Sequence, residues 1–355
     1  MRQWKRIYLV GIFFLVVATI VANLSLTSLQ KDEHNITGEN DYSKAFGVIK
    51  HDVASLAPRY GQMWIQPSGV GVGFVWQDEK DIPPQQRSQT EEVKIASGES
   101  FHPLLLLHSP RETTLLISVL LDYKQVEFTL NDKKGLLHEL VVKPDGDLQI
   151  PMNVEIPEPG QHDLLVIAFY DPWNYNLDPV ARSEQGITVG GRRAVIYSGE
   201  VSTNINEMPQ AMEGKPVPSN VFVNLGVSFA EEQNIQGTNI HPSERQLYVG
   251  VAKSGMPYPY QIWVSNLQQT RSAKIVLLQF QNYHQIPIQN QTLALVGLNK
   301  DEEIFFSEST LPSGKVPVDL LQIVYIYDPY KSLLNEEVMA PFVFGSPRLA
   351  IKWIP

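Results

Sequence analysis

The second half of this 355-residue chain repeats the first half. HDLLVIAFYDPW at 162–173 matches VDLLQIVYIYDPY at 318–330, and GRRAVIYSG at 191–199 matches GSPRLAIKW at 345–353. Upstream, LLDYKQVEF at 120–128 matches FQNYHQIPI at 280–288. The offset between matching positions falls from 160 to 157 to 155 residues, as expected when loops absorb changes in length. The repeat therefore predicts two similar domains built on one plan.

Short apolar runs rich in β-branched and aromatic residues fill both copies, and Gly, Pro, Asn and Asp turn signals separate them. No long helical periodicity lies between these runs. This spacing favours an all-β antiparallel sandwich over a parallel sheet with crossover helices. We expect strands at 69–76, 102–108, 114–123, 138–143, 163–170, 220–229, 246–253, 260–266, 273–280, 291–298, 302–308, 319–327 and 348–354.

PEPGQHDLLVIA at 157–168, leading into Asp171-Pro172, resembles the penultimate strand of immunoglobulin-like and fibronectin-type bacterial surface domains. In those domains a turn glycine leads into a core strand, which a loop joins to the final edge strand. The resemblance implies two tandem immunoglobulin-like antiparallel β-sandwich domains, expected at 61–205 and 206–355. It implies no activity, because many unrelated functions share that sandwich.

The N-terminus has the pattern of an export signal. Three basic residues, Arg2, Lys5 and Arg6, precede an uncharged stretch, and counting from Ile7 to Leu29 gives 23 residues, or roughly 34 Å of helix. We expect residues 1–30 to be a transmembrane signal anchor and 31–60 to be a stalk, with a short helix in its amphipathic part. The basic flank places the N-terminus inside and the domains outside, in a single-pass arrangement. The alternative is a cleaved signal and a secreted protein.

The chain has no cysteine, which excludes disulfides, thiolate metal sites and cysteine nucleophiles. An exported chain of this size without disulfides is more typical of bacterial cell surfaces than of eukaryotic secretion. The formal net charge of −10 argues against nucleic acid or anionic lipid as the main partner of the whole surface.

Seven positions are the same in both copies. The structural interpretation is that they are residues the fold needs, and the functional alternative is a duplicated ligand site. In the structural interpretation, each arginine pairs with an aspartate of its own copy, and the Asp-Pro pairs cap strand ends. The pairs are Tyr123 and Tyr283, Gln125 and Gln285, Asp163 and Asp319, Tyr170 and Tyr327, Asp171 and Asp328, Pro172 and Pro329, and Arg193 and Arg348.

The loops after the two Asp-Pro pairs differ between the copies and are the candidate contact surfaces. The first loop holds Trp173, Asn174, Tyr175 and Asn176, and aromatic rings beside amides are suited to binding sugars. The alternatives are that Trp173 packs back onto the end of the sandwich or contacts a protein. With Asp171 and Asp178 the loop is rich in oxygen ligands, but it lacks the spacing of a calcium loop.

The second loop starts at Tyr330 and is more apolar, so it would form a short helix that covers the sandwich end or meets a partner. A weaker candidate surface contains Tyr258 and Tyr260, followed by Trp263.

Motifs for catalysis and metal binding are missing from the sequence. The eight histidines form no H-x-H or HExxH pattern, and there is no G-x-S-x-G, S-x-x-K or glycine-rich phosphate loop. We therefore expect no cofactor, no metal and no enzymatic activity. The expected function is a membrane-anchored, extracytoplasmic binding or scaffold protein of a bacterial cell surface that contacts a protein or cell-wall glycan through its long loops. A spacer without a ligand and an envelope-polymer hydrolase with two carboxylates are the alternatives.

Overall fold

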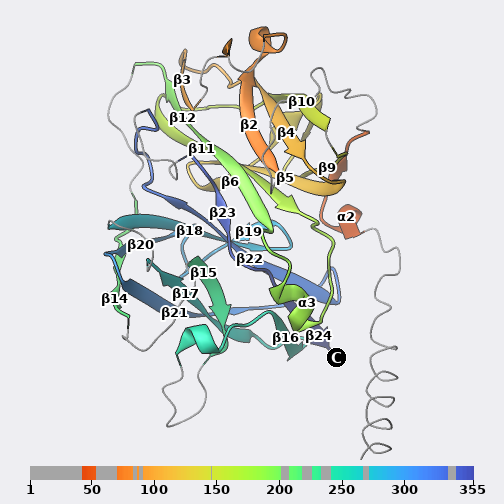
Figure 1. Ribbon diagram of the computed structural model, residues 1–355, viewed down its shortest axis with the longest axis vertical. Coiled ribbons are helices and arrows are strands. Elements are labelled where there is room, and N and C mark those ends of the chain that lie inside the picture. The colour runs from red at the N-terminus through yellow and green to blue at the C-terminus, as the bar shows by residue number, and fades with distance from the viewer. Residues whose placement is uncertain are drawn as a thin grey trace, which may run out of the picture. The chain divides into compact units, whose positions relative to one another are not determined.

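Figure 1 shows a computed structural model, which describes residues 42–52, 70–82, 86–87, 91–144, 146–200, 208–217, 226–232, 241–266, 272–334 and 341–355. Residues Tyr42–Pro355 form one compact unit. The predicted signal anchor at 1–30 and much of the predicted stalk at 31–60 lie outside the described residues. No helix within the described ranges is long and apolar enough to cross a membrane.

The described chain is nearly all β and forms a sandwich of packed sheets, as the sequence predicts. Helical segments are short: α2 (Tyr42–Ala45), η2 (Gln77–Glu79), α3 (Pro179–Ser183) and η4 (Pro242–Glu244). The first half, here residues 42–200, contributes β1 (Ile49–Lys50), β2 (Gly71–Trp76), β3 (Glu92–Ile95), β4 (Pro103–Ser109), β5 (Thr113–Leu121), β6 (Lys124–Val126), β7 (Phe128–Leu130), β8 (Lys133–Gly135), β9 (His138–Val142), β10 (Gly146–Asn153), β11 (Gly160–Tyr170) and β12 (Val189–Ser198).

The second half, here residues 208–355, contributes the remaining strands. They are β13 (Met212–Glu213), β14 (Lys215–Pro216), β15 (Gly226–Ala230), β16 (Val249–Lys253), β17 (Tyr258–Ser265), β18 (Ala273–Gln281), β19 (His284–Ile286), β20 (Ala294–Leu298), β21 (Glu302–Thr310), β22 (Val318–Tyr327), β23 (Phe344–Gly345) and β24 (Leu349–Ile354).

Within the described residues, each half forms one large and one small sheet. The large sheets have the orders β1-β9-β5-β11-β12-β3 and β13-β20-β18-β22-β24-β16, and in both the two edge strands pair in parallel with their neighbours. The small sheets have the orders β2-β4-β10-β7-β8 and β14-β21-β17-β15. The two large sheets therefore repeat one topology.

The strand registers fix which residues are equivalent in the two halves. Leu164 on β11 lies opposite Leu121 and Ala194, and on β22 Leu321 lies opposite Gln281 and Leu349. Leu321 is thus the counterpart of Leu164, at an offset of 157 residues. One position earlier in each strand, Leu320 is the counterpart of Asp163, and Asp319 is the counterpart of His162. The sequence pairing of Asp163 with Asp319 was wrong by one residue.

Three apolar layers hold the four sheets together. One layer lies between the two sheets of the first half and another between the two sheets of the second half. The third joins the two large sheets face to face, with Leu120, Leu165 and Ile167 on one side and Leu278 and Val324 on the other. We call this contact, with the turns at its ends, the junction. Both faces of each large sheet are buried, so continuous apolar runs such as TLLISVLL in β5 match their positions.

Part of the predicted stalk packs against the folded body. The expected helix is only four residues long in α2, and β1 then joins the large sheet of the first half. Phe46, between them, is buried and stacks on Trp173 with ring centroids 6.4 Å apart. The carbonyl of Phe46 also lies 3.1 Å from His284 Nε2 in the second half. Residues 42–52 are therefore part of the body.

Candidate functional site

Two equivalent hairpin turns meet at the junction. Asp122-Tyr123 joins β5 to β6, Asn282-Tyr283 joins β18 to β19, and all four residues have positive φ. This is the conformation of two-residue hairpin turns that match strand twist. The turns present the repeated residues of the two halves to one another.

Gln125 and Gln285 bond each other reciprocally across the junction. The backbone N–H of Gln125 donates to Gln285 Oε1 at 2.8 Å, and the backbone N–H of Gln285 donates to Gln125 Oε1 at 3.0 Å. Their side-chain amides donate to the carbonyls of Tyr283 (3.0 Å) and Tyr123 (2.7 Å) in the opposite half. Such an exchange is the signature of a two-fold, self-complementary interface, here within one chain.

Arg193 carries a complete ion pair on the first-half side of the junction. Its Nε and Nη2 each donate to the Asp163 carboxylate at 3.0 Å, and neither side chain is exposed. Burial raises the pKa of the Asp163 carboxyl, and the nearby Arg193 guanidinium opposes that shift. The Tyr123 hydroxyl and the Tyr330 backbone N–H also donate to Asp163. Arg193 reaches across the junction through Nη1, which donates to the carbonyl of Asp328 at 3.0 Å.

Arg348, the counterpart of Arg193, makes the same cross-junction contact. Its Nη1 donates to the carbonyl of Asp171 at 2.8 Å, and its Nη2 donates to that of Tyr170. The expected pair with Asp319 is not formed, because Asp319 points into the second sandwich core. There it accepts bonds from Trp353 Nε1 (2.9 Å) and Asn282 Nδ2 (2.6 Å). The offset of one residue between the two strands puts Asp319 on the opposite face of its sheet from Asp163.

The first loop, predicted to bind sugar, packs its aromatic rings against the protein. Trp173 stacks on Phe46, meets Tyr283 edge-on at 5.8 Å, and donates from Nε1 to Glu139. Tyr175 meets Tyr42 edge-on at 5.1 Å, and burial raises its pKa far above the ordinary value. These contacts favour the packing alternative, because a ring that is already stacked has less face to offer a pyranose.

The amide and carboxylate oxygens of the same loop bond its own backbone. Asn174 Oδ1, Asn176 Oδ1 and Asp178 Oδ1 each accept the N–H two residues ahead, at 2.8–3.0 Å. The last of these bonds caps α3, which begins at Pro179. Across the described part of the chain, no cluster of three or more His, Asp or Glu side chains is placed to hold a metal ion.

The other predicted contact residues are scattered. Tyr260 has no exposed surface and its hydroxyl bonds Gln279, so it belongs to the second core and not to a surface. Tyr258 lies half-buried on the same strand, β17. Two tyrosines were predicted as repeated structural positions and not as contacts: Tyr327 packs edge-on against Phe344, and Tyr170 is buried at the end of β11. Tyr330 is the one predicted ligand residue that lines the cleft described next.

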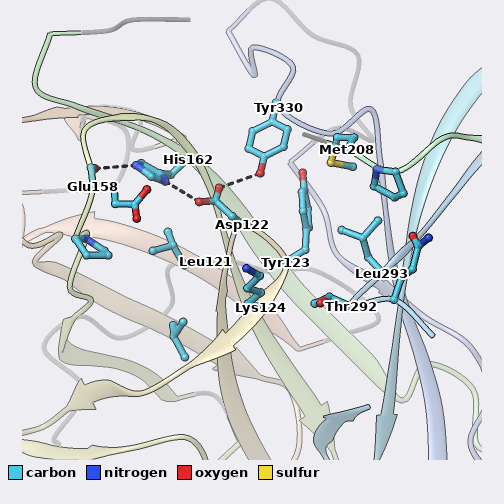
Figure 2. A pocket seen from close by; sticks show the side chains of 14 residues that line it. Leu121, Asp122, Tyr123, Lys124, Glu158, His162, Met208, Thr292, Leu293 and Tyr330 are labelled. Atoms are coloured by element: carbon cyan, nitrogen blue, oxygen red, sulfur yellow. Dashed lines mark hydrogen bonds and ion pairs between the residues drawn. The ribbon is translucent and has the colours of Figure 1, made fainter. Parts of the chain in front are cut away.

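A cleft of about 710 Å³ opens beside the junction and is lined from both halves and from the segment between them (Figure 2). The sequence analysis did not predict it. Its walls come from the first half at Leu121, Asp122, Tyr123, Lys124, Val126, Pro157, Glu158 and His162, from Met208 and Pro209, and from the second half at Gln291, Thr292, Leu293 and Tyr330.

Asp122 links the two sides of this cleft. One carboxylate oxygen lies 2.7 Å from His162 Nδ1, and the other accepts the Tyr330 hydroxyl at 3.1 Å, as Figure 2 shows. His162 Nε2 lies 2.9 Å from the carbonyl of Glu158, so both ring nitrogens face acceptors. The hydrogen bond to Asp122 is the largest cause of a raised His162 pKa. With both ring nitrogens facing acceptors, His162 has no free nitrogen to serve as a general base.

Several residues of these sites were missed by the sequence analysis. Asp122 and Asn282 were hidden because the repeat changes Asp to Asn while keeping the turn. Arg182 on α3 has no counterpart that sequence matching reveals, and it is nearly fully buried. The neighbouring His162-Asp163 pair was a signal, since two polar residues inside an apolar strand point to paired partners on its two faces.

No known protein family matches the sequence, and no curated protein matches it. Three solved structures are similar in part. They are WR4, a C. elegans MSP family member (14% identity, 31% of this chain and 93% of that chain, TM-score 0.20), red sea bream transglutaminase (8%, 82% and 32%, 0.21), and CBD12 from CALX1.2 (9%, 74% and 97%, 0.19). Similarity this low assigns the chain to none of these families.

Proposed function

We propose that this chain is a membrane-anchored, extracytoplasmic binding protein in which two tandem immunoglobulin-like sandwiches form one rigid unit and hold a partner protein in the cleft beside the junction. The observation that carries the proposal is the cleft itself, because its walls come from both halves. Binding sites occur preferentially where two domains meet. The bacterial cell surface remains the expected location, because the N-terminal pattern favours export and an exported chain without cysteine is more typical of bacteria.

The junction supports this proposal because it holds the two cleft walls in place. A shared apolar layer, the reciprocal glutamine bonds and two buried arginines all cross between the halves. A preformed cleft avoids the free-energy cost of ordering its walls when a partner binds. A spacer would need only the rigid junction, whereas a binding protein would also need the cleft.

The lining of the cleft favours a protein partner over a glycan. Its two tyrosine rings, Tyr123 and Tyr330, are buried and packed edge-on at 5.4 Å, so they offer no broad exposed face to a sugar. Exposed Lys124 and Thr292 stand beside half-buried Met208 and Pro209. A mixed polar and apolar lining of this kind is typical of protein interfaces. The engaged His162 argues against acid-base catalysis, so the proposed role is non-enzymatic.

Affinity capture from native membranes tests the proposal. Full-length protein would be compared with Thr292→Arg, which fills the cleft, and Lys124→Glu, which reverses its exposed charge. Lys94→Glu is the matched control, because Lys94 is an equally exposed lysine on strand β3 away from the cleft lining. We expect one partner to be lost with both cleft variants and kept with the control. Capture of the same proteins by all four chains would contradict cleft binding and favour the spacer.

A further inference from the structure

Two buried guanidinium groups at the junction lack counter-charges. Arg182 on α3 is 2% exposed and Arg348 is 3% exposed. Among the described residues, Arg182 Nε and Nη1 and Arg348 Nε have no hydrogen-bond partner, and neither does the buried Tyr175 hydroxyl. We call Arg182, Arg348 and Tyr175 the arginine cluster. A buried charge without a partner is costly, so such groups are normally paired.

Both arginines of the arginine cluster bond the same turn, since Arg182 Nη2 donates to the carbonyl of Asn174 at 3.3 Å and Arg348 Nη1 donates to that of Asp171 at 2.8 Å. Burial lowers the pKa of Arg182 to about 10, and the charge of Arg348 is the next largest cause. No described carboxylate lies within ion-pair distance of either guanidinium. The Asp171 carboxylate is paired with Arg111 at 3.5 Å and is 52% exposed. Asp319, whose charge reaches Tyr175, is already saturated by hydrogen bonds from its own core.

The first half shows what would complete the arginine cluster. Arg193 directs Nε and Nη2 at the two oxygens of Asp163, and Tyr123 adds a hydroxyl donor. At the equivalent place in the second half, Leu320 replaces Asp163, and Arg348 Nε is left without an acceptor. A bound oxyanion would take the place of the missing carboxylate.

We propose that the arginine cluster binds a small dianionic oxyanion, and inorganic phosphate is the representative ligand. Two guanidinium groups match a charge of −2, and their planar N–H forks suit the oxygen geometry of phosphate. The tyrosine hydroxyl supplies a further donor. Both arginines are almost fully buried, so the site would accept the free anion and not a large molecule that bears it. This site is separate from the cleft and stands independently of the proposed function.

Phosphate binding is measured on the full-length protein by isothermal titration calorimetry and by thermal unfolding at constant ionic strength set with chloride. Samples are equilibrated overnight because the site is enclosed. At tenfold excess over its Kd, phosphate is expected to raise Tm by about 2 °C. Sulfate, with the same charge, is expected to give a similar shift, and acetate a much smaller one. A titration without heat, together with an unchanged Tm in phosphate, would overturn the proposal.

Two variants locate the binding. Arg182→Met removes one unpaired charge, so Tm without phosphate is expected to rise and the phosphate-dependent shift to disappear. Leu320→Asp places a carboxylate where the first half has Asp163, and it is expected to displace phosphate in the same way. Arg111→Gln, at an exposed arginine, is the control that should keep the shift. A phosphate shift that survives Arg182→Met would contradict the assignment, and ³¹P spectra of the wild-type protein provide a readout that needs no variant.

Discussion

Arg193 and Arg348 occupy equivalent positions in the two halves of the molecule, but among the described residues only Arg193 is paired with a carboxylate. Both send Nη1 across the junction to the carbonyl of an Asp that precedes Pro. Arg193 then meets Asp163, whereas the equivalent position beside Arg348 is Leu320. The comparison shows that the duplication preserved the backbone scaffold of the junction while one substitution changed its electrostatics.

The largest effect is expected when the first half is made to resemble the second. Asp163→Leu leaves Arg193 buried without its carboxylate and should lower the free energy of unfolding by about 3–5 kcal/mol. Denaturant unfolding measures this loss. Adding Arg193→Met should recover part of it, because an apolar pair then replaces an unpaired charge. If Asp163→Leu costs no more stability than the control Glu155→Leu, at an exposed residue, then the Asp163–Arg193 pair does not stabilise the first half as proposed.

The two arginines should differ when each is replaced by methionine. Arg193→Met leaves the Asp163 carboxylate buried without its ion-pair partner, whereas Arg348→Met removes a donor only from neutral groups, two backbone carbonyls and the Tyr283 hydroxyl. We expect Arg193→Met to be the more destabilising by about 2 kcal/mol. Equal losses in denaturant unfolding would mean that Asp163 contributes little to the stability of the junction.

The reciprocal glutamines test whether the junction is symmetric in energy as well as in geometry. Gln125→Ala and Gln285→Ala should each destabilise by about 1 kcal/mol, and the two losses should be similar. A double-mutant cycle should give a coupling of about 1 kcal/mol, because each side chain bonds the backbone beside the other. Additive losses would show that the two bonds act separately.

The smallest effect is a pH dependence that comes from His162, whose counterpart in the second half is Asp319. The hydrogen bond to Asp122 raises the pKa of His162 above 6.5, so its contribution to stability is full below pH 6.5 and is lost as pH rises through the folded pKa. In the second half, Asp319 stands in place of His162 and accepts a hydrogen bond from Asn282 Nδ2 at 2.6 Å. Unfolding free energies of wild type and His162→Gln should therefore differ most at pH 6 and converge toward pH 9. A constant difference across that range is the contrary outcome.

A histidine pair elsewhere in the first half provides the opposite sign for comparison. Burial lowers the pKa of His138 from 6.5 to about 4, with His51 beside it at 2.8 Å. Because the unfolded chain binds the proton more readily, stability is expected to fall as pH drops from 6.5 toward 4. His138→Gln should reduce this loss of stability at acid pH, as measured by thermal unfolding at a series of pH values.

Several features of the fold could be predicted from local patterns. The alternation of apolar runs with turn signals predicted an all-β chain. Runs such as TLLISVLLDY and DLLVIAFY correspond to β5 and β11 in the structure. The drifting offsets of 160, 157 and 155 residues agree with the strand registers. These signals work because side-chain periodicity and turn chemistry act over a few neighbouring residues.

The sites were harder to predict. The repeated Gln125 and Gln285 were expected to have a structural role, but the sequence did not indicate that they bond each other across 160 residues. Asp163 was matched to Asp319 because both precede Leu-Leu, although the second strand has one residue more before its Asp-Pro. The sequence around Trp173 is that of an exposed loop, and only the tertiary structure places Phe46, Tyr283 and Glu139 against its ring.

The sequence by itself determined that the chain is built from β-strands and that its two halves follow one plan, because both properties are written in local periodicity and in direct repetition. Only the tertiary structure decided that the two large sheets pack face to face, that Arg193 is paired while Arg348 is not, and that a cleft opens beside them. Those features depend on contacts between residues far apart in the chain, where a one-residue change of register moves a side chain to the opposite face of its sheet.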